Sequence, residues 1–361
     1  MKSFLCFNKL KQTVRLKSKR VFSFRNMANS KFEYVKDHET HETLLQNCWI
    51  VIRVDGKGFH KFADKHNFEK PNDLRGLNLM NRCAYSVMNE FYDIMMAYGQ
   101  SDEYSFIFKK ETDVYNRRAH KLISTIASMF ASAYVFNWPK YFGDTKLLYP
   151  PAFDGRSVLY PSDQNLIDYL SWRQADVHIN NLYNTTFWNL VLKANMTPVE
   201  AEKFLCGTFS SDKNEILFSR FNINYNNEPI MFRKGTTLLR KDVFDPLANK
   251  KRNVVVDIHQ DMIQDKFWQT HSEILDKKSK SGELYEPEEG ASMSQLIGGS
   301  LKKHEKLLHG NNNNMIIIKI SFYHKQEKKS MYVLLRKIKI NHLKLWNVKI
   351  LPRDFYILLN K

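Results

Sequence analysis

Cysteine is scarce in this chain of 361 residues, which has four cysteines and no C-x-x-C pair. That spacing argues against a disulfide framework and a zinc ribbon, and it is typical of a protein from a reducing compartment. Long apolar runs are also missing: no stretch approaches about 18 apolar residues without a charge, so we expect no membrane-spanning helix. Hydrophobic residues nevertheless make up 43% of the chain and aromatic residues 13%, which excludes a mostly disordered protein.

Acidic residues are absent from residues 1–26, which carry eight Lys and Arg and a net charge of +8. Residues 301–361 carry fourteen basic and three acidic residues, a net charge of +11. Since the whole chain has a formal net charge of +17, residues 27–300 have a net charge of −2. The excess lies at the two ends, so the global charge does not predict nucleic-acid binding by the body of the protein.

The two basic ends are expected to lie outside the main fold. Residues 1–26 mix basic and apolar residues as a mitochondrial transit segment does, and an ordinary basic tail is the alternative. Met27 could serve as an internal start, so we expect the protein in the cytoplasm, the mitochondrion or both, depending on which methionine is used. Residues 277–361 form a basic, low-complexity tail that contains the run Asn311–Asn314.

Residues 27–160 alternate between strand and helix patterns. Apolar, β-branched runs predict strands, and apolar residues at helical spacing predict helices. The order strand, helix, strand, strand, helix, strand predicts an α+β, ferredoxin-like domain (βαββαβ). The predicted elements are a strand at 49–54, a helix from a cap at Asn72 or Asp73 to about Met96, a hairpin at 97–108, a helix at 119–133 and a strand at 153–160.

Residues 161–276 are predicted to be mainly helical, with one extended patch, and to complete the body of the protein. The pattern favours a long helix over 163–193, a helix that begins at Thr197-Pro198, and an Asn-rich, turn-like segment over 221–231.

Two acidic residues are brought together by this topology. Right-handed crossovers place the first and third strands side by side and antiparallel. Asp55, at the end of the first strand, then lies beside Asp102, at the beginning of the third. Two carboxylates on adjacent strand ends, with the backbone carbonyl of Gly56, suit a pair of Mg²⁺ ions that would neutralise a leaving pyrophosphate. Each acid alone is also ordinary turn chemistry, so their convergence carries the prediction.

Five sequence blocks resemble the tRNA-histidine guanylyltransferase family, in the family's order. They are Arg53–Phe62, Tyr98–Phe106, Trp172–Asn184, Lys213–Phe218 and Asn222–Pro229, within a region of similarity that spans about residues 27–276. The resemblance implies a polymerase-type palm and an enzyme that adds one guanylate to the 5′ end of histidine tRNA. ATP would activate the tRNA 5′-phosphate, the 3′-hydroxyl of GTP would displace AMP, and the added nucleotide would lose pyrophosphate.

The same resemblance implies roles for individual residues. Asp55, Gly56 and Asp102 would hold two Mg²⁺ ions per active site, Glu103 would have a supporting catalytic role, and the protein would be a homotetramer. The residues expected to hold nucleotide in these two blocks are Asp55, Gly56, Lys57, Gly58, Phe59, His60, Ser101 and Asp102.

Several basic residues have a functional and a plain structural interpretation. Lys70 could pair with a triphosphate or be a surface lysine. Arg118 and Lys121 share a helix face that could bind a second triphosphate or stay solvated. His60 could contact nucleotide or pack against the following helix. Arg53, within a strand, should point toward a phosphate or a carboxylate, because burying an unpaired guanidinium is costly.

His178, Asn181 and Asn184 form an amide-rich face that resembles the family's RNA-facing block, and plain helix surface is the alternative. A 3′-to-5′ tRNA repair polymerase acting on 5′-truncated tRNAs would use the same metal site. A non-catalytic ferredoxin-like RNA-binding module is the alternative from another class, but such modules read RNA with exposed aromatic residues rather than paired acids. A cyclase-like use of the same palm would leave the RNA-facing blocks unexplained.

Overall fold

The computed structural model describes most of residues 31–275 and three strand segments near the C-terminus. The chain divides into two units, residues 1–42 and 43–361, and the first contains a short 3-10 helix, η1 (Glu33–His38), without buried side chains. The extension expected at 1–26, the start at Met27 and most of the tail expected at 277–361 lie outside the described residues. The described residues are 31–245, 250–275, 315–319, 347–350 and 356–360.

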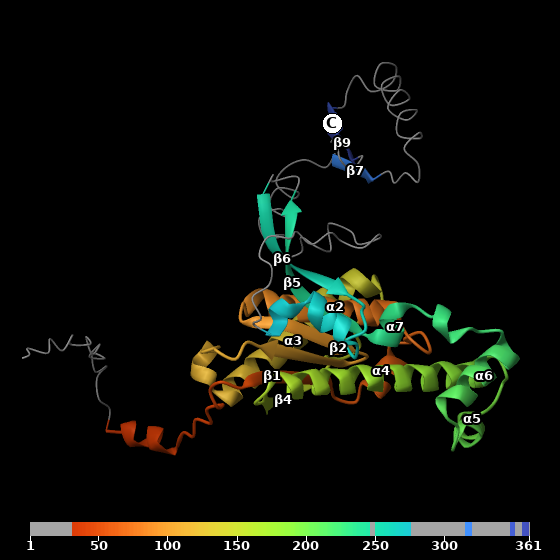
Figure 1. Cartoon of the computed structure of the whole chain (residues 1–361), viewed down its shortest axis with the longest axis horizontal. Helices are drawn as coiled ribbons and strands as arrows, with labels where there is room; N and C mark the ends of the chain where they lie inside the picture. The colour runs from red at the N-terminus through yellow and green to blue at the C-terminus, as the bar shows by residue number, and fades with distance from the viewer. Residues whose placement is uncertain (1–30, 246–249, 276–314, 320–346, 351–355, 361) are drawn as a thin grey trace, which may run out of the picture. The chain divides into compact units, whose positions relative to one another are not determined.

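Six strands form one sheet in the order β4-β1-β3-β2-β5-β6, and each neighbouring pair is antiparallel (Figure 1). Three further strands form a second sheet in the order β7-β9-β8. The strands are β1 (Trp49–Gly56), β2 (Ile94–Gln100), β3 (Glu103–Phe108), β4 (Phe153–Tyr160), β5 (Thr236–Asp245), β6 (Lys250–Ile258), β7 (Met315–Lys319), β8 (Asn347–Ile350) and β9 (Tyr356–Asn360).

The predicted long helix and the helix that follows Thr197-Pro198 are both confirmed. Thr197 caps the second of these helices in a capping box with Glu200. The helices are α1 (Phe59–Lys65), α2 (Leu74–Glu90), α3 (Ala119–Phe142), α4 (Asp163–Leu192), α5 (Pro198–Leu205), α6 (Ser210–Phe221), α7 (Ile230–Lys234) and α8 (Asp265–Thr270), with the 3-10 helices η2 (Val114–Arg117), η3 (Tyr225–Asn227) and η4 (Ser272–Leu275). Among the helices of the described residues, none combines the length and the apolar character that crossing a membrane requires.

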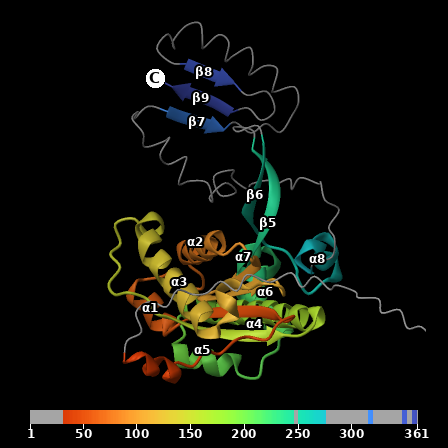
Figure 2. The same ribbon diagram turned by 90° about the vertical axis from the view of Figure 1, so that its left-hand side faces the viewer.

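The order β4-β1-β3-β2 is the predicted ferredoxin-like arrangement, with β1 and β3 antiparallel at its centre. Helices α2 and α3 cover one face of the sheet and α4 lies along the other (Figures 1 and 2). Alternate residues of β1 enter the two cores: Ile50 and Ile52 pack with α2 and α3, and Trp49 and Val51 pack with α4. Because both faces are covered, β1 reads in the sequence as a continuous apolar run.

The expected end of the first long helix is wrong. α2 stops at Glu90, and Ile94 begins β2 instead of continuing the helix to Met96. Phe91 and Ile94 continue the helical spacing, but the backbone of Phe91 is extended and its buried ring packs in the core below the sheet edge. At the other end, Asp73 rather than Asn72 caps α2, accepting hydrogen bonds from the backbone N–H groups of Arg75 and Gly76.

The hairpin β5–β6 is missing from the sequence prediction, which gave residues 161–276 one extended patch among helices. β5 pairs with β2 and β6 pairs with β5, so the sheet continues through residues beyond 160. Charged residues at Arg240-Lys241-Asp242 and Lys250-Lys251-Arg252 interrupt the alternation of apolar residues in both strands. The period of two is therefore weak in the sequence, although the strands pair over nine positions.

Candidate active site

The tips of β1 and β3 meet as the topology predicts. Asp55 is the register partner of Glu103, and the backbone N–H of Gly56 donates to the carbonyl of Asp102 at 3.0 Å. Asp102 and Ser101 form the turn between β2 and β3, where Ser101 has a φ of 48°. The turn between β2 and β3 thus places Asp102 beside the end of β1, where Asp55 lies.

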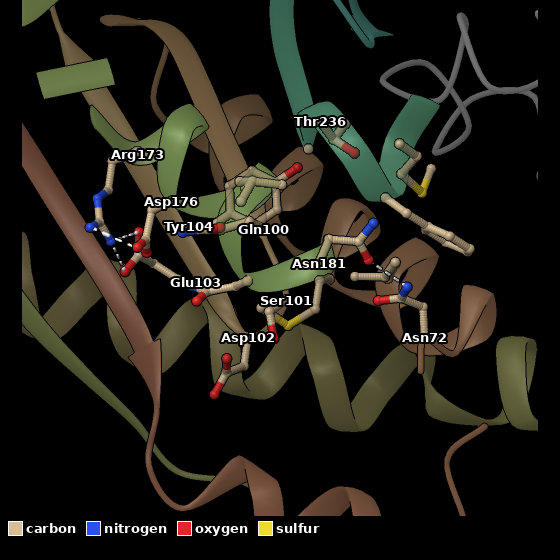
Figure 3. A pocket seen from close by; sticks show the side chains of 18 of the residues that line it. Asn72, Gln100, Ser101, Asp102, Glu103, Tyr104, Arg173, Asp176, Asn181 and Thr236 are labelled. Atoms are coloured by element: carbon tan, nitrogen blue, oxygen red, sulfur yellow. Dashed lines mark hydrogen bonds and ion pairs between the residues drawn. The ribbon is translucent and has the colours of Figure 1, made fainter. Parts of the chain in front are cut away.

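A pocket of about 330 Å³ opens at these strand tips (Figure 3). Its walls come from β1, the β2–β3 turn, the segment before α2, and from α2, α4, α7 and β5. Six of the residues that the sequence nominated line it: Asp55, Ser101, Asp102, Glu103, Asn181 and Asn184.

Asp102 is the acid whose surroundings are most unusual. Removal from water, together with the neighbouring carboxylates of Asp55 and Glu103, raises the pKa of Asp102 to about 6. We call Asp55, Asp102 and Glu103 the acidic edge of the pocket. A cation bound beside Asp102 would stabilise its ionised form, so the edge is electrostatically suited to a metal ion.

Glu103 differs from the other two acids because guanidinium groups hold it. Its carboxylate accepts two hydrogen bonds from Nη1 of Arg173, at 3.2 and 3.3 Å, and Nε of Arg53 lies 3.8 Å away. Arg173 also lies 3.5 Å from Asp176 and its guanidinium is 3.6 Å from the ring centroid of Trp172. The prediction that Arg53 points toward a carboxylate is confirmed.

The acidic edge offers oxygen atoms, the donors that Mg²⁺ prefers. Among the described residues, no group of three or more His, Cys, Asp or Glu side chains is arranged to hold a metal ion. Mg²⁺ commonly takes only one or two protein carboxylates and completes its shell with water and substrate phosphates. Two carboxylates, Asp55 and Asp102, with the adjacent carbonyl of Gly56, therefore fit a magnesium site that the substrate completes.

Glycine at position 56 is required by close packing. A Cβ atom there would lie 2.3 Å from the ring of Phe59. Phe59 is 8% exposed and its ring stacks on Phe62 at 4.9 Å between centroids, so the ring belongs to the core. Gly58, with a φ of 67°, precedes α1 in the left-handed conformation that favours glycine.

The pocket lining includes none of Gly56, Gly58 and Phe59, and it also lacks the candidates Lys57, His60 and Lys70. Lys57 is exposed. The side chain of His60 is 81% exposed and lies 3.4 Å from Asp64, so the packing alternative for His60 is wrong. Lys70 donates to Asp64 at 2.7 Å and lies 5.1 Å from the ring centroid of Trp188, with 22% of its side chain exposed, so it is not a freely solvated lysine.

Arg118 and Lys121 lie together at the start of α3, away from the pocket lining. Nε of Arg118 donates to the carbonyl of Tyr115 at 3.2 Å, and Nζ of Lys121 is 4.7 Å from the centroid of the same tyrosine ring. Both cations thus contact Tyr115, but Arg118 is the N-cap of α3 with an extended backbone and is not part of a helix face. A second triphosphate there stays a prediction.

The α4 candidates have three different environments. Asn184 is exposed at the pocket, whereas Asn181 is 6% exposed and bonded at both ends of its amide. The ring of His178 lies 5.5 Å from that of Tyr225, and burial, with Lys234 and Arg233 nearby, lowers its pKa. Plain helix surface is therefore wrong for Asn181, and RNA contact by the three residues stays a prediction.

Sequence reasoning missed most of the neutral lining. We call Asn72, Asn180, Asn181 and Asn184 the amide wall. Figure 3 shows Asn72 and Asn181 joined on one side of the pocket, and Arg173 with Glu103 and Asp176 on the other. Arg173 and Asp176 lie in a block that the sequence singled out, and their i,i+3 spacing on a predicted helix was the available signal.

Two family models match the chain: one described as tRNAHis guanylyltransferase over residues 32–161, and one described as Thg1 C terminal domain over residues 164–286. The probable tRNA(His) guanylyltransferase of Drosophila melanogaster is 59% identical over 251 residues, which cover 70% of this chain and 87% of the relative. That of Bos taurus is 56% identical over 269 residues, covering 70% and 90%.

Solved structures resemble the chain as well. The crystal structure of tRNA(His) guanylyltransferase from Saccharomyces cerevisiae has 49% sequence identity and a TM-score of 0.56, covering 62% of this chain and 95% of that one. A bacterial tRNA(His) guanylyltransferase-like protein in complex with ATP has a TM-score of 0.55, covering 68% and 99%. At 20% identity, this second likeness concerns the fold alone.

Proposed function

This chain belongs to the tRNAHis guanylyltransferase family and is a nucleotidyltransferase, and from that premise we propose that it adds one guanylate to the 5′ end of histidine tRNA. The observation that carries the proposal is the acidic edge, where Asp55 and Asp102 line one pocket from neighbouring strand tips. The proposed substrates are histidine tRNA, GTP and ATP.

The proposed reaction has three steps. The tRNA 5′-phosphate attacks the α-phosphorus of ATP and releases pyrophosphate, which leaves the tRNA adenylylated. The 3′-hydroxyl of GTP then attacks the tRNA 5′-phosphorus, loses its proton and displaces AMP. Hydrolysis of the new 5′-triphosphate releases pyrophosphate and leaves a 5′-monophosphate. Phosphoryl-transfer chemistry of this kind depends mainly on positioning and on charge stabilisation.

The residues of the chain supply that stabilisation in the proposed site. Asp55, Asp102 and the carbonyl of Gly56 would hold two Mg²⁺ ions, which when bound lower the negative charge of the transferring and leaving phosphates. Glu103 keeps Arg173 at the pocket and ties α4 to β3. Ser101 and Asp102 sit on a turn whose backbone is bonded to Gly56, which fixes the acids relative to one another.

We also propose that the protein is a homotetramer, as the family resemblance implies. Light scattering of the purified protein would measure it directly.

The proposal is tested with labelled GTP, ATP, Mg²⁺ and 5′-phosphorylated histidine tRNA. We expect a product one nucleotide longer, and no such product when ATP is left out with a 5′-monophosphate substrate. A parallel arm uses histidine tRNA lacking its first nucleotides. Extension of the truncated RNA alone, with intact tRNA left unchanged, would replace the proposal by 3′-to-5′ repair.

A further inference from the structure

The sequence block Asn222–Pro229 has no part in the proposed chemistry, yet it places one side chain against the amide wall. We propose that Tyr225 is a positioning residue whose hydroxyl orients Asn181 and, through it, the half-buried Asn72, so that the amide of Asn72 presents a fixed donor and acceptor to a nucleobase in the pocket. This inference rests on the proposed function, because it says how the same pocket holds the base of a substrate.

The block folds into a turn that buries Tyr225. The side chain of Asn224 accepts a hydrogen bond from the backbone N–H of Asn226 at 3.0 Å, which closes η3 around the tyrosine. Tyr225 is 3% exposed and packs in one cluster with Leu182 of α4 and Leu217 of α6. The ring is therefore held by apolar contacts, and its hydroxyl is the only polar group that it brings to α4.

The hydroxyl of Tyr225 is the first member of a chain of hydrogen bonds, the relay, which ends at Asn72 in the pocket lining. Nδ2 of Asn181 donates to the hydroxyl of Tyr225 at 2.9 Å, and Oδ1 of Asn181 accepts from Nδ2 of Asn72 at 2.8 Å. Asn181 is 6% exposed, so both ends of its amide depend on these partners rather than on water. The partners lie 44 and 109 positions away in the sequence, so the relay joins η3, α4 and the segment before α2.

The chemistry of the lining favours a nucleobase over a phosphate at this wall. Among the residues that line the pocket, Arg173 is the only cationic side chain, and Glu103 engages it. Amide groups recognise the donor and acceptor edges of bases, whereas phosphates are held by cations and backbone N–H groups. The base comes from the free nucleotide or from the end of the RNA, and the test below separates the two sources.

The first test is Tyr225→Phe, which keeps the ring and its packing and removes only the hydroxyl. We expect kcat/KM for guanylate addition to fall about 10-fold, mainly through KM, because a bidentate base contact discriminates by about this amount. The matched control is Tyr134→Phe, since the buried hydroxyl of Tyr134 has no hydrogen-bond partner among the described residues. We expect the control to keep wild-type KM and kcat.

The second test is a mutant cycle between Asn72→Ala and Tyr225→Phe, two residues that both hydrogen-bond to Asn181. If Tyr225 acts by positioning, the combined loss is smaller than the product of the two separate losses. In an Asn181→Ala background, Tyr225→Phe should then have no further effect. A purely structural role would instead multiply the losses in every background, and that result would overturn the proposal.

The two sources of the base are separated by the substrate whose KM changes. A higher KM for GTP or ATP assigns the base to the nucleotide, and a higher KM for tRNA assigns it to the RNA. Unchanged KM values for all three in Tyr225→Phe, with activity lost only in proportion to folded protein, would exclude positioning. Equilibrium dialysis with GTP alone repeats the comparison without transfer, so that the inference can be judged even if histidine tRNA proves not to be the substrate.

Discussion

The acidic edge and the amide wall face the same pocket but satisfy their polar groups in opposite ways. At the wall, Asn181 bonds to Asn72 and to Tyr225, so both ends of its amide have partners within the chain. At the edge, the carboxyl group of Asp102 lies beside like charges, and its pKa is raised to about 6. The wall is pre-organised without a ligand, whereas the edge gains most from a bound cation.

The largest expected effect comes from removing charge at the edge. Asp102→Asn and Asp55→Asn keep the shape of each side chain but remove a ligand from the proposed metal site. We expect guanylate addition to fall by about 10³-fold or more, because transition-state charge stabilisation by metal ions is worth several kcal/mol. Single-turnover rates with labelled GTP measure the loss.

The matched control for these two variants is Asp154→Asn. Asp154 is the register partner of Asp55 on β4, but its side chain is 56% exposed, paired with Arg156 and outside the pocket lining. We expect activity within about twofold of wild type. If either Asp55→Asn or Asp102→Asn retained wild-type turnover, the metal assignment would be wrong.

The sequence predicted how the acidic edge is brought together, but it did not predict the hydrogen bonds of the amide wall, although Asn181 and Asn184 were candidates. Asp55 and Asp102 follow strands whose order and handedness determine which tips meet. The bonds from Asn181 to Asn72 and Tyr225 depend on how α4, η3 and the segment before α2 pack, which no local period encodes. The resemblance placed Asn181 in a functional block, but it gave no sign that the amide is buried.

The secondary structure likewise contains elements that the sequence predicted and elements that it did not. β4 was predicted with its observed bounds because turn-type residues flank it, Pro150-Pro151 before it and Pro161-Ser162 after it. The hairpin β5–β6 was missed because charged residues interrupt the apolar alternation of both strands, and the sequence does not show that β5 pairs with the distant β2. Where an element draws its stability from distant partners, its sequence carries a weak local signal.

The next largest effect is expected at Arg173, which joins Glu103 of the acidic edge to α4, the helix that also carries Asn181. Arg173→Met leaves Glu103 half-buried without its main partner, so we expect the free energy of unfolding to drop by about 3 kcal/mol and activity by about 10-fold or more. Urea denaturation and initial rates measure the two losses. The double variant Arg173→Met/Glu103→Gln should recover most of the stability, because the unpaired charge is gone. A double variant as unstable as Arg173→Met would show that packing on Trp172, rather than charge, holds the arginine.

Varying the pH tests the acidic edge apart from the amide wall, because it changes the charge of Asp102 without changing the shape of any side chain. The pKa of Asp102 is about 6 in the folded protein against an ordinary value of 3.8, so the folded state binds this proton more tightly than the unfolded state. The contribution of Asp102 to stability is therefore fully present below about pH 4 and is lost as the pH rises to about 6. Activity should change in the opposite direction, falling about tenfold per pH unit below pH 6, because metal binding needs the carboxylate.

Thermal melting of the magnesium-free protein at several pH values measures the stability effect. The difference in Tm between wild type and Asp102→Asn should grow between pH 4 and 6, with the wild type losing stability relative to the variant as the pH rises. A pH-independent difference would mean that the burial of Asp102 does not raise its pKa.

The smallest expected effects lie within the amide wall and test whether burial, rather than residue type, decides what an asparagine does there. Asn181→Ala leaves the side chain of Asn72 and the hydroxyl of Tyr225 without their shared partner, so we expect the free energy of unfolding to fall by roughly 1 to 3 kcal/mol. Asn184→Ala, one turn later and exposed, should change it by less than about 0.5 kcal/mol. Paired urea titrations of the two variants measure both changes in the free energy of unfolding. Equal losses would show that Asn181 and Asn184 have the same environment, which would contradict the burial of Asn181.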